Sequence, residues 1–98
     1  MNELLAGTAN AAGTSTGAAR IIAGSYNVTA SSLNVRSGPG TGYEIVASYD
    51  RGGIINGIAA DTLAANGYVW AHYTAYSGKT RYVAIGTADG SEKYLVKV

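Results

Sequence analysis

Apolar and polar residues alternate along the chain from Tyr26 onward. Tyr26, Val28 and Ala30 fall on one side of an extended chain, and the polar Asn27 and Thr29 fall on the other. Successive side chains of a strand point to opposite faces of a sheet, so this period of two predicts a half-buried strand. No stretch of about ten residues shows a convincing helical period.

Further segments have the composition of strands, and residues typical of turns separate most of them. The clearest turn is Asn66-Gly67, because both residues tolerate the positive φ of a two-residue hairpin turn. Asp61–Asn66 is predicted as a loop. About five to seven short strands at this spacing predict an all-β fold, a small barrel or sandwich. The further strands are predicted at Leu33–Arg36, Glu44–Tyr49, Ile54–Ala60, Tyr68–Tyr76, Thr80–Ile85 and Tyr94–Val98.

The N-terminal part differs from the rest in composition. Gly7–Gly24 consists almost wholly of Gly, Ala, Ser, Thr and Asn, which bury little apolar surface. We therefore predict a flexible linker over residues 1–24 and one domain over residues 25–98; a frayed helix end at Asn2–Ala6 is an alternative. The first residues lack the basic and long apolar regions of a signal peptide, so synthesis in the cytoplasm is expected.

Composition excludes several classes of function. A net charge of +1 argues against nucleic acid as a partner and against a polybasic membrane anchor. No apolar run approaches the roughly 20 residues of a membrane span. The chain has 0 cysteines, which excludes disulfides and thiolate chemistry. No cofactor and no metal are expected, because no ligand-spaced loop is present.

Two motifs together resemble one family. Residues 33–40, LNVRSGPG, resemble the signature of bacterial SH3-type (SH3b) domains, in which a short strand enters a glycine-rich loop. Downstream, Val69–Gly86 resembles the tryptophan strand, Ser-Gly turn and tyrosine strand of SH3b targeting domains in Gram-positive wall hydrolases. Its matching residues are Trp70, Tyr73, Ser77, Gly78, Tyr82 and Ile85.

The resemblance implies a small SH3-like barrel and a function. It implies a non-catalytic domain that binds Gram-positive peptidoglycan or an associated wall glycan. The parent protein would be a bacteriophage endolysin, with an N-acetylmuramoyl-L-alanine amidase or an endopeptidase as its enzyme. The domain would then act at the wall during host lysis, an antimicrobial role.

Two further hypotheses concern partners. The same barrel is also compatible with a protein-interaction module that binds a peptide or another subunit. A homo-oligomer, or association with the full-length lysin, is expected because linked binding sites gain avidity.

Aromatic side chains are candidates for ligand contact because they stack on sugar rings and peptide planes. Trp70 and Tyr82 lie on predicted strands, where core packing and ligand contact are both open. Tyr43, Tyr49 and Tyr76 lie in or beside loops, which favours binding. These three rings are predicted to line one groove.

Asn34 and Arg36 share the outward phase beside the glycine loop, so they are predicted at the edge of that groove. Arg36 has two open roles. Its guanidinium is suited to a carboxylate of a wall peptide, and equally to a clasp over loop carbonyls.

Catalytic chemistry is not supported. His72 is the only histidine, no nucleophile pairs with it in the sequence pattern, and a position on the surface or at a pocket edge is favoured. The acidic residues are scattered, and Asp50, Asp61 and Asp89 lie at turns, where Asp bonds to backbone amides. An enzyme is therefore not expected.

Overall fold

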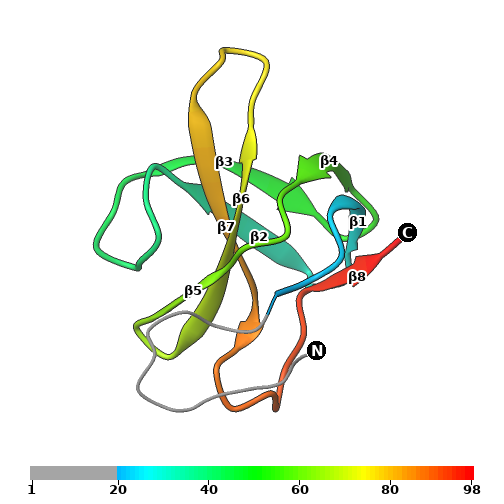
Figure 1. Cartoon of the computed structure of the whole chain (residues 1–98), viewed down its shortest axis with the longest axis vertical. Helices are drawn as coiled ribbons and strands as arrows, with labels where there is room; N and C mark the ends of the chain where they lie inside the picture. Colours follow the sequence, from blue (N-terminus) through cyan, green and yellow to red (C-terminus); the bar gives the residue numbers. More distant parts are fainter. Residues whose placement is uncertain (1–19) are drawn as a thin grey trace.

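The computed structural model describes residues 20–98 and shows eight strands in two sheets (Figure 1). The all-β prediction is confirmed, with one strand more than the upper limit of the predicted range. Among the described residues, no helix is long and apolar enough to cross a membrane. The strands are β1 Gly24–Val28, β2 Ser32–Arg36, β3 Ile45–Asp50, β4 Ile54–Ile58, β5 Leu63–Ala65, β6 Tyr68–Thr74, β7 Thr80–Thr87 and β8 Leu95–Lys97.

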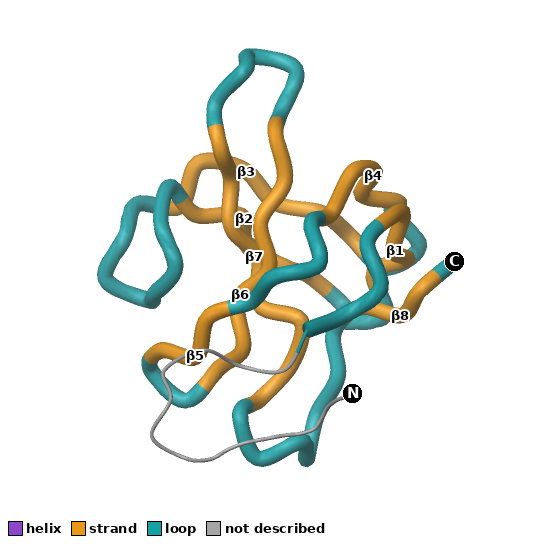
Figure 2. Tube along the Cα trace, viewed as in Figure 1, coloured by secondary structure: helices purple, strands orange, loops and turns teal. Residues whose placement is uncertain are grey.

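The sheets have the orders β4-β1-β8 and β3-β2-β7-β6-β5. All pairings between strands are antiparallel, and Figure 2 shows short loops joining most of them. The longest contact is the hairpin of β6 and β7, in which Trp70 pairs with Ala84 and Thr74 pairs with Thr80.

The core lies between the two sheets. Side chains from β1, β2, β4, β6, β7 and β8 meet there. The core residues of β1, β2 and β6 are two apart, as period two predicts, whereas Ile55 and Ile58 of β4 are three apart. Tyr26 and Tyr73 are 7% and 8% exposed, so in this chain without phenylalanine two tyrosines fill the core. The largest fully buried side chains are Val28, Val35, Ile55, Ile58 and Val83.

The strand β5 corrects one prediction. Residues 61–66 are predicted as a loop, and Leu63-Ala64-Ala65 indeed has weak strand propensity. In the structure these three residues pair with β6 through the Asn66-Gly67 turn, with Leu63 opposite Trp70. Pairing with a long neighbouring strand therefore outweighs weak local propensity.

Most of the predicted linker, residues 1–19, lies outside the described residues, as does the alternative helix end at Asn2–Ala6. The segment directly before β1 contacts the barrel. Ile21 donates its backbone N–H to the Ala60 carbonyl at 2.9 Å and packs against the core, and the Ile22 carbonyl accepts a bond from the Tyr26 hydroxyl at 2.6 Å. We therefore propose that the domain begins near Ile21 rather than at residue 25.

Candidate functional site

The five-stranded sheet presents one face away from the core. Arg36 pairs with Tyr82, and Tyr82 pairs with His72. Residues directly opposite each other in antiparallel strands point to the same side, so these three share a face. Trp70 lies on this face two residues before His72, and Asn34 two residues before Arg36. We call this side of the sheet the outer face. It brings together four of the predicted ligand-binding residues, Asn34, Arg36, Trp70 and Tyr82.

A groove with a volume of about 610 Å³ lies on this side of the barrel. β2 pairs with β7 at Arg36↔Tyr82 alone, so the two strands separate toward Ser32 and leave the groove between them. The glycine-rich loop after β2 and the segment before β8 also contribute to it. Its lining includes Ser31, Ser32, Asn34, Arg36, Thr41, Tyr68, Trp70, Ala84, Glu92, Lys93 and Tyr94.

Trp70 combines packing with a place in the groove lining. Its side chain is 3% exposed, and the indole Nε1–H donates to the Ala65 carbonyl at 2.9 Å. The Tyr68 ring meets it edge to face, with centroids 6.0 Å apart. Trp70 therefore fixes β5 and Tyr68 and supplies the buried base of the groove.

Arg36 holds the glycine-rich loop. Its Nη1 donates to the carbonyl of Thr41 at 3.1 Å and to that of Tyr43 at 3.0 Å. The clasp, one of the two roles that the sequence left open, is therefore present. Arg36 also lines the groove, so the clasp holds the guanidinium at the groove wall.

We call residues 37–44 the glycine loop. Close contacts explain why two of its positions are glycine. A Cβ on Gly38 would overlap the ring of Tyr43, and one on Gly40 would lie 2.8 Å from Oδ1 of Asn66. The same Oδ1 accepts a bond from the Thr41 N–H at 3.0 Å, while Asn66 has a φ of 54° in the hairpin turn. Asn66 therefore ties the glycine loop to the β5–β6 hairpin.

No family model and no curated protein matches the chain. Solved structures do match it. The SH3b domain of lysostaphin, in a structure titled as its P4-G5 complex, is 22% identical with a TM-score of 0.60, and the match covers 79% of this chain and 81% of that one. The chain has the SH3b fold.

Two further matches have higher sequence identity. The cell wall binding domain of the staphylococcal phage 2638A endolysin is 25% identical with a TM-score of 0.61, over 79% of this chain and 83% of that one. Ly7917 is 35% identical with a TM-score of 0.60, again over 79% of this chain. The match covers 32% of Ly7917, so this SH3b chain spans about a third of that protein.

The predicted tyrosines do not gather in the groove of this SH3b domain. Tyr43 is 51% exposed and lies on the glycine loop with its ring over Gly38, beside the groove. Tyr49 is half-buried, packs against the core and hydrogen-bonds Tyr73. Burial, and then this bond, raise the pKa of Tyr73. Tyr49 is thus committed to packing on the other side of β3.

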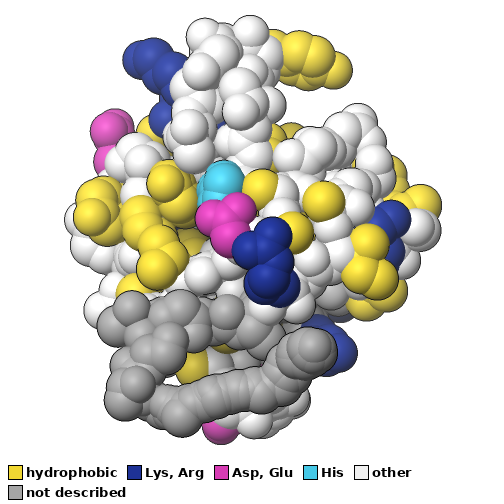
Figure 3. All heavy atoms as spheres, viewed as in Figure 1, with side chains coloured by type: hydrophobic (Ala, Val, Ile, Leu, Met, Phe, Trp, Pro, Cys, Tyr) yellow, Lys and Arg dark blue, Asp and Glu magenta, His cyan; other side chains and the backbone are white. Residues whose placement is uncertain are grey.

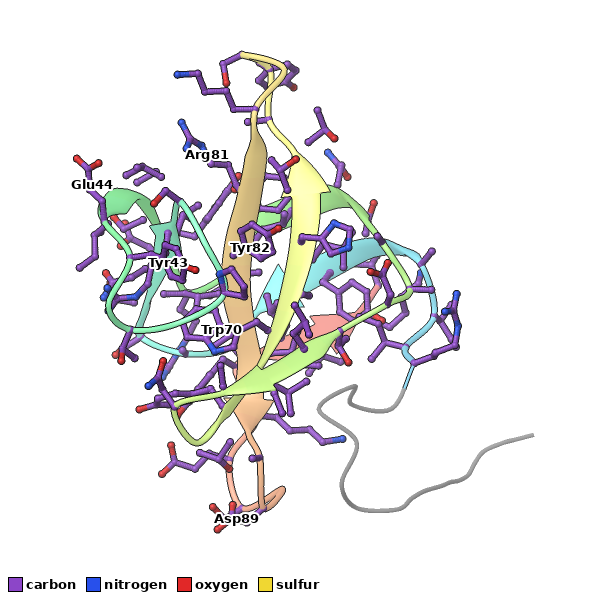
Figure 4. The ribbon with its side chains drawn as sticks, turned by 60° about the vertical axis from the view of Figure 1, so that its left-hand side comes forward. Tyr43, Glu44, Trp70, Arg81, Tyr82 and Asp89 are labelled. Atoms are coloured by element: carbon purple, nitrogen blue, oxygen red, sulfur yellow. The ribbon has the colours of Figure 1, made fainter. Side chains whose placement is uncertain are left out.

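Tyr82 and Tyr76 also differ in their surroundings. Tyr82 is half-buried on the outer face, and its ring centroid lies 5.8 Å from that of His72. Figure 4 shows Tyr43, Trp70 and Tyr82 on the same side of the barrel. Tyr76 is fully exposed at the tip of the β6–β7 hairpin, away from that cluster. The expectation of one groove for Tyr43, Tyr49 and Tyr76 therefore does not match the geometry.

His72 and Asp61 form a pair that the sequence pattern did not predict. His72 Nε2 lies 2.9 Å from Asp61 Oδ2, and Figure 3 shows the histidine against an acidic side chain on the molecular surface. The bond from His72 holds the pKa of Asp61 below its usual range. A depressed carboxyl pKa stabilises the fold above the ordinary pKa, and this contribution is lost as the pH falls through the folded-state value. The pair fastens the β4–β5 connection to β6, together with the Ala59 N–H bond to the His72 carbonyl at 2.9 Å.

The far wall of the groove, Glu92–Tyr94, was also missed. The Tyr94 hydroxyl donates to Glu92 Oε1 at 3.0 Å, and this bond is the main cause that raises the pKa of Tyr94. The Tyr94 ring lies 6.3 Å from that of Tyr68 across the groove lining. Sequence alone could not place these residues in the groove, because they are far from β2 in the chain. The bridge between Gly86 and Lys93 brings them beside it.

The described residues hold no group of three or more His, Cys, Asp or Glu side chains placed to bind a metal ion. The chemistry of this side of the molecule is therefore that of an open groove with aromatic, amide and charged groups.

Proposed function

We propose that this chain is a non-catalytic targeting domain that binds Gram-positive peptidoglycan or an associated wall polymer. The groove is the observation that carries the proposal. It combines Tyr68, Trp70 and Tyr94 with the amide of Asn34 and the guanidinium of Arg36. Solved structures with the same fold include a domain described as cell wall binding, which supports this role.

The groove has the chemistry to hold an extended peptide or a glycan. Aromatic rings pack against sugar rings and peptide planes, and the Asn34 amide both donates and accepts hydrogen bonds. β2 pairs with β7 at Arg36 alone, which leaves the edge of β2 from Ser32 to Asn34 open toward the groove. An extended chain can bond to such an open edge through its backbone.

Charged groups complement these contacts. Arg36 is held by two loop carbonyls through a single nitrogen, Nη1, so its remaining N–H groups are free to face a carboxylate of the wall peptide. Glu92 and Lys93 supply both signs of charge on the opposite wall. The arrangement suits a zwitterionic peptide better than a strongly charged polymer.

The domain would act by adsorption. The parent chain we propose is a phage endolysin whose amidase or endopeptidase cuts bonds near the site where the SH3b domain is held. Tethering raises the local concentration of the enzyme at the wall without any catalytic group in the domain itself. In the described residues, His72 contacts Asp61 and the ring of Tyr82, with no hydroxyl nucleophile among its bonded partners.

Replacing Asn34 by Ala should weaken binding to purified Gram-positive walls several-fold, because about 1 kcal/mol is lost with a hydrogen bond to the ligand. Asn34 is exposed, so the melting temperature should not change. Asn56→Ala is the matched control, since Asn56 is an exposed asparagine on β4 of the other sheet. Co-sedimentation with walls over a range of protein concentrations measures the wall binding of both variants.

Equal binding by the Asn34 and Asn56 variants would contradict the assignment of the groove. An unmodified protein that stays in the supernatant with walls from a panel of Gram-positive species would contradict wall binding itself. That second result would favour the alternative, a module that binds a protein subunit.

We also propose that the domain self-associates or binds the full-length lysin. Ile54 and Val96 both pair with Asn27, so they share the outer side of the three-stranded sheet, where they are 45% and 49% exposed. Apolar side chains grouped on one face are typical of association surfaces. Light scattering should give a mass above that of the monomer at micromolar concentration. A monomer mass for the unmodified protein, equal to that of Val96→Asp at every concentration, would contradict the proposal.

A further inference from the structure

The hairpin of β6 and β7 extends beyond the body of the barrel (Figure 1). At its tip Tyr76 has a relative exposure of 109%, the highest among the large apolar side chains. Thr74, Ser77, Gly78, Lys79 and Thr80 around it are exposed as well. The ring of Tyr76 therefore contributes nothing to packing of the described structure.

The tip is nevertheless well defined by hydrogen bonds. The Ala75 N–H donates to the Lys79 carbonyl at 2.9 Å, and the Gly78 N–H donates to the Ala75 carbonyl at 2.9 Å. Gly78 has a φ of 84°, which suits glycine and closes the turn. A turn fixed in this way leaves the backbone at Tyr76 and Lys79 little conformational entropy to lose on binding.

The hairpin carries positive charge without negative charge. Lys79 and Arg81 are its ionisable residues other than tyrosine and His72, and residues 73–88 contain no Asp or Glu. Among residues 20–98, neither cation takes part in an ion pair. The hairpin therefore carries both unneutralised cations and, at its tip, an exposed aromatic ring.

The tip is separate from the groove. Trp70 and Ala84, which pair with each other, line the groove, whereas Thr74 and Thr80 pair at the end of the hairpin. The two positions are four residues apart along each strand, a distance of roughly 13 Å. None of Tyr76, Lys79 and Arg81 lines the groove.

We propose that the tip of the β6–β7 hairpin is a second contact site, for an anionic wall polymer linked by phosphodiesters. The ammonium of Lys79 and the guanidinium of Arg81 attract phosphate oxygens. The Tyr76 ring packs against the carbon face of the polyol or sugar unit between phosphates. The choice of an anionic wall polymer rests on the wall location under the proposed function, but the site and its ligand differ from those of the groove.

Binding at the tip is individually weak and gains from repetition. Lys79 is exposed and Arg81 is half-buried, so each cation contributes little in water, and salt screens both. A polymer with a phosphate in each unit offers many equivalent sites, so a domain that is already held through its groove rebinds such a polymer readily. The two sites together would make adsorption to an intact wall tighter than to bare peptidoglycan.

The test uses the purified domain and two separate ligands. The first is phosphodiester polymer extracted from a Gram-positive wall and used in solution; the second is the same wall after hydrofluoric acid has removed that polymer. Lys79→Ala and Tyr76→Ala should each weaken binding to the free polymer by about three- to tenfold. Both should leave binding to the stripped wall and the melting temperature unchanged. About 1 M salt should abolish binding to the free polymer.

Lys97→Ala is the matched control, since Lys97 is an exposed lysine on β8 of the other sheet. The proposal is overturned if the unmodified domain does not bind the free polymer, or if Lys97→Ala weakens that binding as much as Lys79→Ala. It is also overturned if Tyr76→Ala weakens binding to the stripped wall. If instead the proposed function of the groove is wrong, the unmodified domain will not bind the stripped wall.

Discussion

Replacing Trp70 by Ala lowers the expected free energy of unfolding by about 3–5 kcal/mol, the usual cost of removing a buried aromatic side chain. Trp70 is 3% exposed, so the deletion leaves a cavity beneath the groove. It also leaves the Ala65 carbonyl without its indole donor and Tyr68 without its edge-to-face partner. The short strand β5 should therefore loosen first, because Leu63 is paired directly opposite Trp70.

Denaturant unfolding followed by circular dichroism measures this loss, with Tyr76→Ala as the aromatic control. Tyr76 is fully exposed, so its removal should leave stability within about 0.5 kcal/mol of the unmodified protein. Trp70→Phe retains a ring but no N–H donor and should fall between the two. If Trp70→Ala is as stable as the unmodified protein, the structural role of Trp70 is contradicted.

Gly86→Ala is expected to destabilise the domain by about 1–3 kcal/mol, although it adds a single methyl group. Gly86 is buried and bridges to Lys93 in the antiparallel sense. A Cβ at this position would overlap the backbone carbonyl oxygen of Glu92, and backbone cannot move aside as a side chain can. That carbonyl also accepts the Thr87 N–H at 3.0 Å, so the segment before β8 must shift.

The shift should also affect the groove, because Lys93 and Tyr94 form one of its walls. Weaker wall binding is therefore expected together with the lower stability. Gly42→Ala is the matched control, since a Cβ there meets nothing within 4 Å and its φ is not in the positive region. Thermal unfolding of both variants tests this prediction. Comparable melting temperatures would show that the segment before β8 shifts without cost to stability.

The stability of Gly42→Ala has a defined direction of its own. Where the native backbone conformation suits alanine, this substitution reduces the entropy of the unfolded chain and stabilises by about 0.4–1 kcal/mol. The two glycine variants should therefore move in opposite directions, although both replace a glycine outside the core cluster. Their difference tests the close approach at Gly86 more sharply than either measurement alone.

The sequence by itself determined the strands and turns of most of this protein. Alternation in β1 and β2, and the turns at Asn66-Gly67 and Ser77-Gly78, are local properties, because side-chain phase and positive φ depend on few neighbouring residues. The same phase placed Asn34 and Arg36 together on the outer side of β2. The two motifs that resemble SH3b domains also pointed to the fold that the solved structures share.

Only the tertiary structure decided what each outward residue contacts. The groove takes its walls from segments as distant as β2 and Glu92–Tyr94, and no local pattern records that β2 and β7 separate after one pair. The role of Arg36 depended on where the carbonyls of the glycine loop came to lie. Tyr49 and Tyr76 have similar positions beside turns, yet one packs against the core and the other stands free. Burial depends on which distant strands cover a side chain, and that is settled when the two sheets pack together.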